Sequence, residues 1–197
     1  GQYENLATID VNDTVDNPVS DTDPSHYFGS SLDLVVQKYT NTFDADNPTG
    51  PVIGVDSAVY WTYEIINTGN VPLLYNQIRD DAGTDSDDTD DFTPVPIPAT
   101  GFNSGDINEN DTIDTGETWY YKYDSVASTT GQYKNIVTVR VFDTTGVQAD
   151  VTDPSHYFGA KPGILVQKHT NGEDADTEPG PYVLVDSLVT WYYYVTN

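Results

Sequence analysis

One acidic loop, GDINENDTIDTGE (residues 105–117), carries oxygen-bearing side chains at regular intervals. Calcium takes about six to eight oxygen ligands, and a loop of the EF-hand type supplies them from positions 1, 3, 5, 7, 9 and 12. Counted from the first aspartate, these positions hold Asp106, Asn108, Asn110, Thr112, Asp114 and Glu117. The spacing therefore predicts a Ca2+ site in which Thr112 binds through its main-chain carbonyl and Glu117 through both carboxylate oxygens.

The loop departs from this pattern at position 6, where Asp111 replaces the glycine expected at the sharp turn. Aspartate tolerates the left-handed backbone conformation better than most residues, so the departure is compatible with the loop. A strand follows the loop instead of a helix, which predicts a static site and not a sensor. The alternative is a polar loop whose Asp and Asn side chains only cap turns.

Two further groups of aspartates suggest a second cation site. Asp44 and Asp46 stand just before a Gly-Pro turn, and Asp80 and Asp81 end the predicted strand 71–79. If that strand pairs as expected in a sandwich, its end meets the Asp44/Asp46 loop. Asp174 and Asp176 repeat the first pair later in the chain.

Near the presumed linkers, Asp23 and Asp153 are further candidate ligands. A cation bound there would stiffen the joint between neighbouring domains. His26 and His156 occupy equivalent places in two copies of the sequence SHYF. We interpret them as strand or interface residues, because one histidine per repeat cannot make a zinc site alone.

The chain repeats itself with an offset of 130 residues. GQYENLATIDVNDT at 1–14 returns as GQYKNIVTVRVFDT, TDPSHYFG at 22–29 returns unchanged, and VQKYTNTFDADNPTGP at 36–51 returns as VQKHTNGEDADTEPGP. This period suits a tandem array of whole domains. We expect one complete domain at 31–159, the C-terminal strands of a preceding repeat at 1–29, and the N-terminal strands of a following repeat at 162–197. The end pieces lack the middle strands, and their pairing as a split domain stays open.

Alternating apolar residues predict strands throughout. Val59, Trp61, Tyr63 and Ile65 share one face of such a strand. We interpret these aromatic residues as core, with a carbohydrate-stacking platform as the alternative. Trp119, Tyr121 and Tyr123 alternate in the same way with Thr118, Tyr120 and Lys122. The remaining predicted strands are 32–40, 71–79, 92–98, 132–142 and 150–158.

The connections between these strands indicate the fold class. Asn67-Thr68-Gly69-Asn70 predicts a hairpin turn between two strands. Three prolines make 92–98 an edge strand or an extended loop. No segment has helical periodicity, and about seven short strands in ~130 residues predict an all-β, immunoglobulin-like β-sandwich repeated in tandem.

Composition excludes several functional classes. The 32 acidic residues against seven Lys and Arg give a net charge of −25, so nucleic acid and anionic membrane surfaces are poor partners. No apolar run approaches the ~18 residues that a membrane span needs. The absence of cysteine excludes disulfides and thiolate chemistry. Since no common catalytic motif is present, we expect neither an enzyme nor a small-molecule substrate.

Four stretches together resemble a known module: VQKYTNTFDADNPTGP, VDSAVYWTYEIINTGNVPL, GDINENDTIDTGETWYYKY and GQYKNIVTV. They resemble the tandem Ig-like repeats of very large bacterial surface proteins, including RTX adhesins. The resemblance implies a string of calcium-binding β-sandwich extenders that stiffen outside the cell and hold a ligand-binding tip away from its surface. It also implies calcium ligation by the loop residues and by Asp44, Asp46, Asp80 and Asp81.

On this interpretation, the partners are neighbouring repeats of the same polypeptide and the location is the bacterial cell surface. The alternative function is a carbohydrate- or protein-binding β-sandwich module of a secreted protein.

Overall fold

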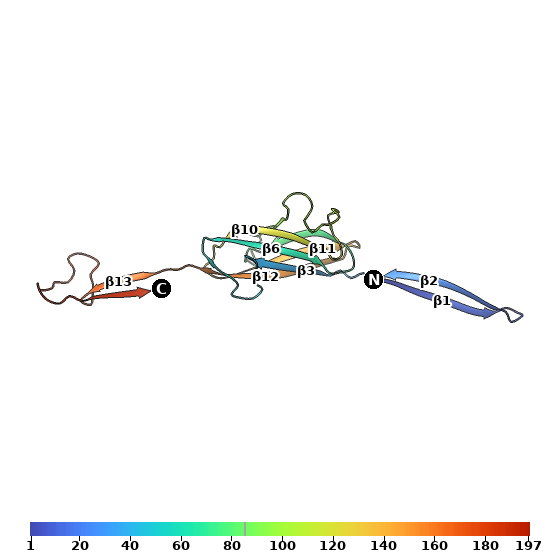
Figure 1. Cartoon of the computed structure of the whole chain (residues 1–197), viewed down its shortest axis with the longest axis horizontal. Coiled ribbons are helices and arrows are strands. Elements are labelled where there is room, and N and C mark those ends of the chain that lie inside the picture. The colour runs from blue at the N-terminus through green and yellow to red at the C-terminus, as the bar shows by residue number, and fades with distance from the viewer. Residues whose placement is uncertain (85) are drawn as a thin grey trace. The chain divides into compact units, whose positions relative to one another are not determined.

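The computed structural model describes residues 1–84 and 86–197, and these residues form strands but no helix. The chain divides into two compact units, Gly1–Gly159 and Ala160–Asn197 (Figure 1). Their strands assemble into four separate sheets. The all-β prediction is therefore confirmed.

Two five-stranded sheets form the centre of the first unit. One has the order β4-β3-β6-β10-β8, and the other has the order β5-β12-β11-β7-β9. The strands of the first sheet are β3 (Leu34–Thr40), β4 (Phe43–Asp44), β6 (Ala58–Asn67), β8 (Val95–Pro96) and β10 (Thr118–Val126). Those of the second are β5 (Val52–Gly54), β7 (Leu73–Asp80), β9 (Thr112–Ile113), β11 (Gly131–Asp143) and β12 (Gln148–Ala160).

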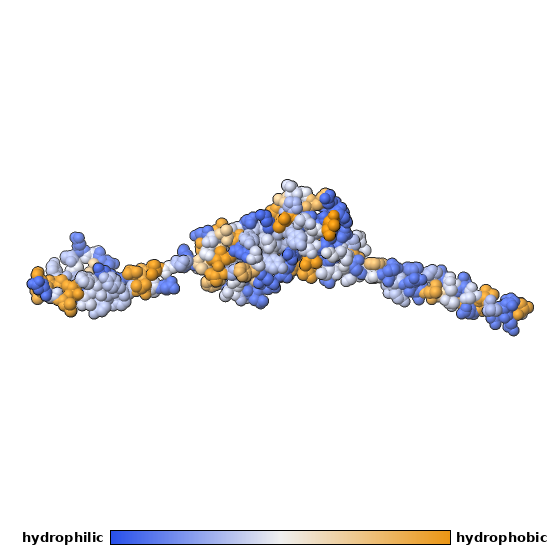
Figure 2. Space-filling model, viewed as in Figure 1, coloured by the Kyte–Doolittle hydropathy of each residue, from blue (hydrophilic) through white to orange (hydrophobic). Residues whose placement is uncertain are grey.

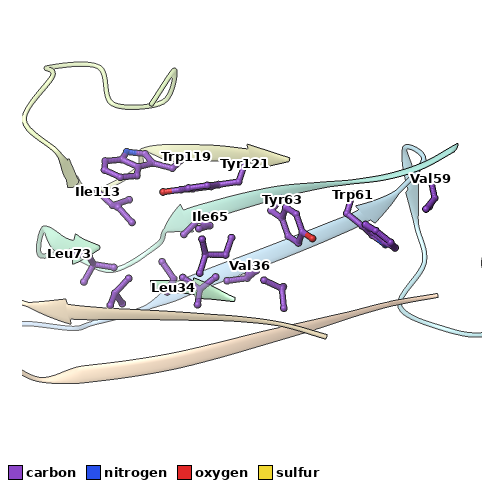
Figure 3. Close-up of a cluster of buried hydrophobic side chains, with 14 of the residues drawn as sticks. Leu34, Val36, Val59, Trp61, Tyr63, Ile65, Leu73, Ile113, Trp119 and Tyr121 are labelled. Atoms are coloured by element: carbon purple, nitrogen blue, oxygen red, sulfur yellow. The ribbon is translucent and has the colours of Figure 1, made fainter. Parts of the chain in front are cut away.

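The alternating residues of β6 face a core shared by both sheets. Val59, Trp61, Tyr63 and Ile65 are all at most 3% exposed. Figure 3 shows them beside Val36 of β3 and other apolar side chains between the sheets. Fully burying one such side chain contributes roughly 1.5–3 kcal/mol, so this face holds the two sheets together in a sandwich-like arrangement.

The segment Asn67–Asn70 is not a hairpin turn, contrary to the sequence-based prediction. Strand β6 pairs with β3 and β10, whereas β7 pairs with β11 and β9. The segment therefore crosses from one sheet to the other. Asn67 is fully buried and donates to the carbonyls of Val71 (2.9 Å) and Ile113 (2.8 Å), which satisfies backbone groups at this crossing.

The proline-rich segment 92–98 contributes only the two-residue strand β8. It pairs with β10 through Tyr121 opposite Pro96 and Lys122 opposite Val95. Because proline has no N–H to donate, β8 lies at the edge of its sheet, as predicted.

Two smaller sheets repeat parts of the central ones. Strands β1 (Gln2–Asn12) and β2 (Pro18–Phe28) form one; β13 (Leu165–Thr170), β14 (Glu173–Asp174) and β15 (Trp191–Thr196) form the other. Tyr3 opposes Tyr27 as Tyr133 opposes Tyr157, so the repeat keeps the register. Apolar groups lie at the surface of these small sheets (Figure 2), including Trp191, which is 52% exposed.

Candidate functional site

The acidic loop lies between β8 and β10 and is tied to the sandwich at several points. Strand β9, in its middle, pairs with β7, and Ile113 is fully buried. Just before the loop, Asn103 accepts from the Tyr120 N–H at 2.9 Å and donates to the Tyr120 carbonyl at 2.8 Å. These contacts fix both ends of the loop relative to the core.

Asp106 and Glu117, the first and last predicted ligands, are buried at 5% and 6% exposure. Asp106 accepts from the backbone N–H groups of Asn110 (3.1 Å) and Asp111 (2.8 Å). Glu117 accepts from the N–H groups of Ile107 and Asp114, both at 3.0 Å. Both carboxylates therefore fold the loop around themselves.

Between these two residues, the amide side chains gather on Asp114. Asn108 Nδ2 and Asn110 Nδ2 lie 2.7 and 3.1 Å from Asp114 Oδ2. The Thr112 N–H donates to Asn110 Oδ1 at 2.8 Å. Rotation of an Asn amide exchanges its nitrogen for its oxygen, so these amides can present oxygen to a cation beside Asp114.

The residue at position 6 has the conformation that the loop type requires. Asp111 adopts φ of 56°, in the left-handed region where glycine is usual. Aspartate replaces glycine here without changing the direction of the turn.

The charges in this loop lack protein counter-ions. No Lys or Arg among the described residues forms an ion pair with Asp106, Asp114 or Glu117. In the part of the chain that the structure describes, no three His, Cys, Asp or Glu side chains converge in metal-binding geometry. The loop instead combines carboxylates with amides and a carbonyl, an all-oxygen set that fits calcium.

A second acidic region comprises Asp153, Asp44 and Asp46, whose charges influence one another. Asp153 is 8% exposed and accepts from the Lys38 N–H at 2.6 Å. The pKa of Asp153 is raised to about 6, first by burial and then by the charges of Asp46 and Asp44, against the lowering effect of the hydrogen bond from the Lys38 N–H. Burial, followed by the charge of Asp44, also raises the pKa of Asp46. Asp153 is thus close enough to Asp44 and Asp46 for their charges to act on its pKa, although the three carboxylates do not converge in metal-binding geometry in the part of the chain that the structure describes.

The other predicted partners of Asp44 and Asp46 make different contacts. Asp81 Oδ1 accepts from the N–H groups of Gly83 (2.9 Å) and Ile136 (2.7 Å). Asp80 is fully buried and belongs to the polar cluster described next. Both oxygens of Asp80 and one oxygen of Asp81 are therefore already engaged by protein donors.

The remaining three predicted ligands are exposed; Asp23 and Asp174 lie on the small sheets, and Asp176 lies just after β14. Asp23 lies on β2 opposite Ala7. Asp174 accepts from Gln167 at 2.9 Å, and Asp176 follows two residues later. By the 130-residue offset they are equivalent to Asp153, Asp44 and Asp46.

Sequence reasoning missed a buried polar cluster in the core. Asp80 lies 2.7 Å from Lys38 Nζ, and it accepts from Tyr63 Oη at 2.8 Å and from Asn135 Nδ2 at 2.6 Å. All four residues are 0% exposed. Burial lowers the pKa of Lys38 to about 8, although the Asp80 carboxylate opposes this shift. Burial and the neighbouring Asp80 raise the pKa of Tyr63.

A search against protein-family models finds no match to this chain, and no curated protein or solved structure matches it either. Within the described residues, no helix is long and apolar enough to span a bilayer. The side-chain geometry therefore carries the functional assignment.

Proposed function

We propose that this chain is a non-catalytic, calcium-stabilised extender of a large bacterial cell-surface adhesin. The observation that carries the proposal is the loop 106–117. The Asn108 and Asn110 amides gather on Asp114. The buried carboxylates of Asp106 and Glu117 stand at the two ends of the loop, and none of these three acids has a cationic partner among the described residues. A bound Ca2+ would neutralise these carboxylates.

The strand order supports an immunoglobulin-like domain. Lettered along the chain from A to G, the strands β3, β6, β7, β8, β10, β11 and β12 give sheets in the orders A-B-E-D and G-F-C. An Ig domain of the constant type has strands A, B, E and D in one sheet and C, F and G in the other. The edge strands β4, β5 and β9 are additions to this framework.

Calcium contributes stability only where its concentration is high. Extracellular calcium modules bind with Kd of about 10⁻⁴–10⁻³ M. At about tenfold above Kd, one site adds roughly 1.4 kcal/mol to the free energy of unfolding. The module would therefore be loose at low cytosolic calcium and rigid outside the cell.

The group of Asp44, Asp46 and Asp153 is the second calcium site of the proposal. Its members come from the beginning and the end of one repeat, so a cation there would join the two ends of that repeat. Asp174, Asp176 and Asp23 would have the same roles in neighbouring repeats, which are the partners that we propose. Asp80 and Asp81 are not included, because protein donors already occupy both oxygens of Asp80 and one oxygen of Asp81.

Calorimetry in EDTA and in a few millimolar CaCl2 tests the proposed function, with MgCl2 as the control. Two sites at about 1.4 kcal/mol each predict a calcium-specific rise in Tm of roughly 10 °C. An unchanged Tm would mean that the loop is only a polar turn.

A second candidate function is carbohydrate or peptide binding. A hollow of about 500 Å3 is lined by aromatic residues, among them Trp61, Phe92, Tyr123 and Tyr133. The Trp61 indole N–H is buried and has no hydrogen-bond partner among the described residues. Titration with sugars and peptides, followed by tryptophan fluorescence, distinguishes the candidates, because an extender with a filled core gives no saturable change.

A further inference from the structure

Three residues from three strands meet in the core. Lys38 comes from β3 in one sheet, whereas Asp80 on β7 and Asn135 on β11 come from the other. The Lys38 amine lies 2.7 Å from Asp80 Oδ2, and the Asn135 amide donates to Asp80 Oδ1 at 2.6 Å. One carboxylate therefore holds an amine and a carboxamide side by side, each on its own oxygen.

This arrangement leaves two buried polar groups without a well-formed hydrogen bond. Despite the short distance to Asp80, Lys38 Nζ makes no hydrogen bond of good angular geometry, and Asn135 Oδ1 has no partner among the described residues. Lysine is almost never fully buried without a complete set of partners. The rings of Trp61 and Tyr63, centred 5.9 and 5.8 Å from Nζ, enclose the amine in apolar surroundings.

We propose that Lys38 and Asn135 become joined by an isopeptide bond, with Asp80 as the group that transfers the protons. The product is a neutral amide whose single N–H can donate to Asp80. Formation of this bond removes the buried ammonium group, and with it the unsatisfied donors.

The reaction needs no cofactor and no oxidant. Asp80 takes a proton from the Lys38 ammonium, and the neutral amine attacks Cγ of Asn135. Asp80 passes that proton to Nδ2, the Cγ–Nδ2 bond breaks, and ammonia leaves. Asp80 then removes the extra proton from Nζ and gives it to the departing ammonia. The net change is Lys ammonium plus Asn carboxamide to secondary amide plus ammonium ion.

The chain contains its own controls. Lys168 and Asn5 are the repeat equivalents of Lys38 and Asn135, but both are exposed. The residue equivalent to Asp80 would lie 130 positions away, outside residues 1–197. Because both side chains are exposed, we expect them to stay unmodified in this chain.

Mass spectrometry of the intact chain with its natural sequence tests the proposal directly. We expect a mass about 17 Da below the sequence mass, from the loss of one ammonia. A tryptic digest should yield one branched species that joins the peptides containing Lys38 and Asn135. Lys38→Met, Asn135→Ala and Asp80→Asn should restore the full mass, whereas Lys168→Met and Asn5→Ala should leave the loss unchanged.

Two results would overturn the proposal. One is a folded chain that has its full sequence mass. The other is a loss that persists in Lys38→Met, which would assign it to succinimide formation at an asparagine. The main measurement uses the natural sequence, so it does not depend on whether the variants fold. It is also independent of calcium.

Discussion

Glu117 is the residue whose replacement best tests the calcium loop. Its Oε1 accepts from the Ile107 N–H at 3.0 Å, and its Oε2 accepts from the Asp114 N–H at 3.0 Å and from Trp119 Nε1 at 3.3 Å. In Glu117→Gln, the single oxygen can serve only one side. The better orientation keeps the two donors at Oε2 and leaves the Ile107 N–H facing an NH2 group.

The magnitude follows from these contacts. One buried donor without an acceptor costs about 1–3 kcal/mol, and the loss of charge weakens the two remaining bonds by about 0.5 kcal/mol each. We therefore expect Glu117→Gln to lower the free energy of unfolding by roughly 2–4 kcal/mol in EDTA. In saturating calcium, the variant should lose a further ~1.4 kcal/mol, because the bidentate ligand is gone.

Urea unfolding of the natural chain and of Glu117→Gln measures the two losses separately. EDTA isolates the loss of hydrogen bonding, and calcium adds the loss of the ligand. Glu109→Gln is the matched control, since it removes one negative charge from an exposed position of the same loop. The reasoning would be refuted if Glu117→Gln kept the full calcium-dependent increment, or if Glu109→Gln abolished it equally.

Three further predictions concern other parts of the chain. In thermal unfolding, Gly105→Ala should destabilise the loop by at least about 2 kcal/mol, because the new Cβ would lie 1.7 Å from the Thr118 carbonyl oxygen. Gly163→Ala is the control and should be neutral, because a Cβ at that position meets nothing within 4 Å. In EDTA, the free energy of unfolding should fall by about 1–2 kcal/mol as the pH rises from about 4 to about 6, because the raised pKa of Asp153 makes the folded state hold its proton longer than the unfolded state. Asp153→Asn should flatten this profile, and an unchanged profile would assign it to another group. Lys38→Met should cost about 5 kcal/mol or more in urea unfolding, because it removes the proposed cross-link around a loop of nearly 100 residues and the amide N–H that donates to Asp80. Lys168→Met should have almost no effect, and equal losses in the two variants would contradict the assigned roles.

Local patterns predicted the strands well, because alternation is a short-range signal. The face of β6 that carries Trp61 and Tyr63 could be identified directly from period-two spacing. The predicted hairpin at Asn67–Asn70 was wrong for a non-local reason. Turn residues indicate that the chain reverses, but the partner strands, which are distant in sequence, decide which sheet it enters next.

The candidate sites also differ in whether their residues are close together or distant in the sequence. The loop 106–117 could be predicted because its candidate ligands lie within twelve consecutive residues. The influence of the Asp44 and Asp46 charges on Asp153 depends on the packing of the first strands against the last, which no local pattern encodes. The signal for the buried cluster was present but easily overlooked: Lys38 occupies an inward position of β3, in the alternation that also buries Leu34 and Val36.

The position of Lys38 on the first core strand and Asn135 on the penultimate one has a mechanical consequence. A pull along an array of such repeats enters each domain at β3 and leaves it at β12. In the cross-linked form, tension passes from Lys38 directly to β11, and the chain between residues 38 and 135 carries no load. The loop 106–117, which is the proposed calcium site, lies inside this shielded segment. Force could then separate the edge strands, but it could not extend the chain between residues 38 and 135. An array of such domains would therefore lengthen very little under tension.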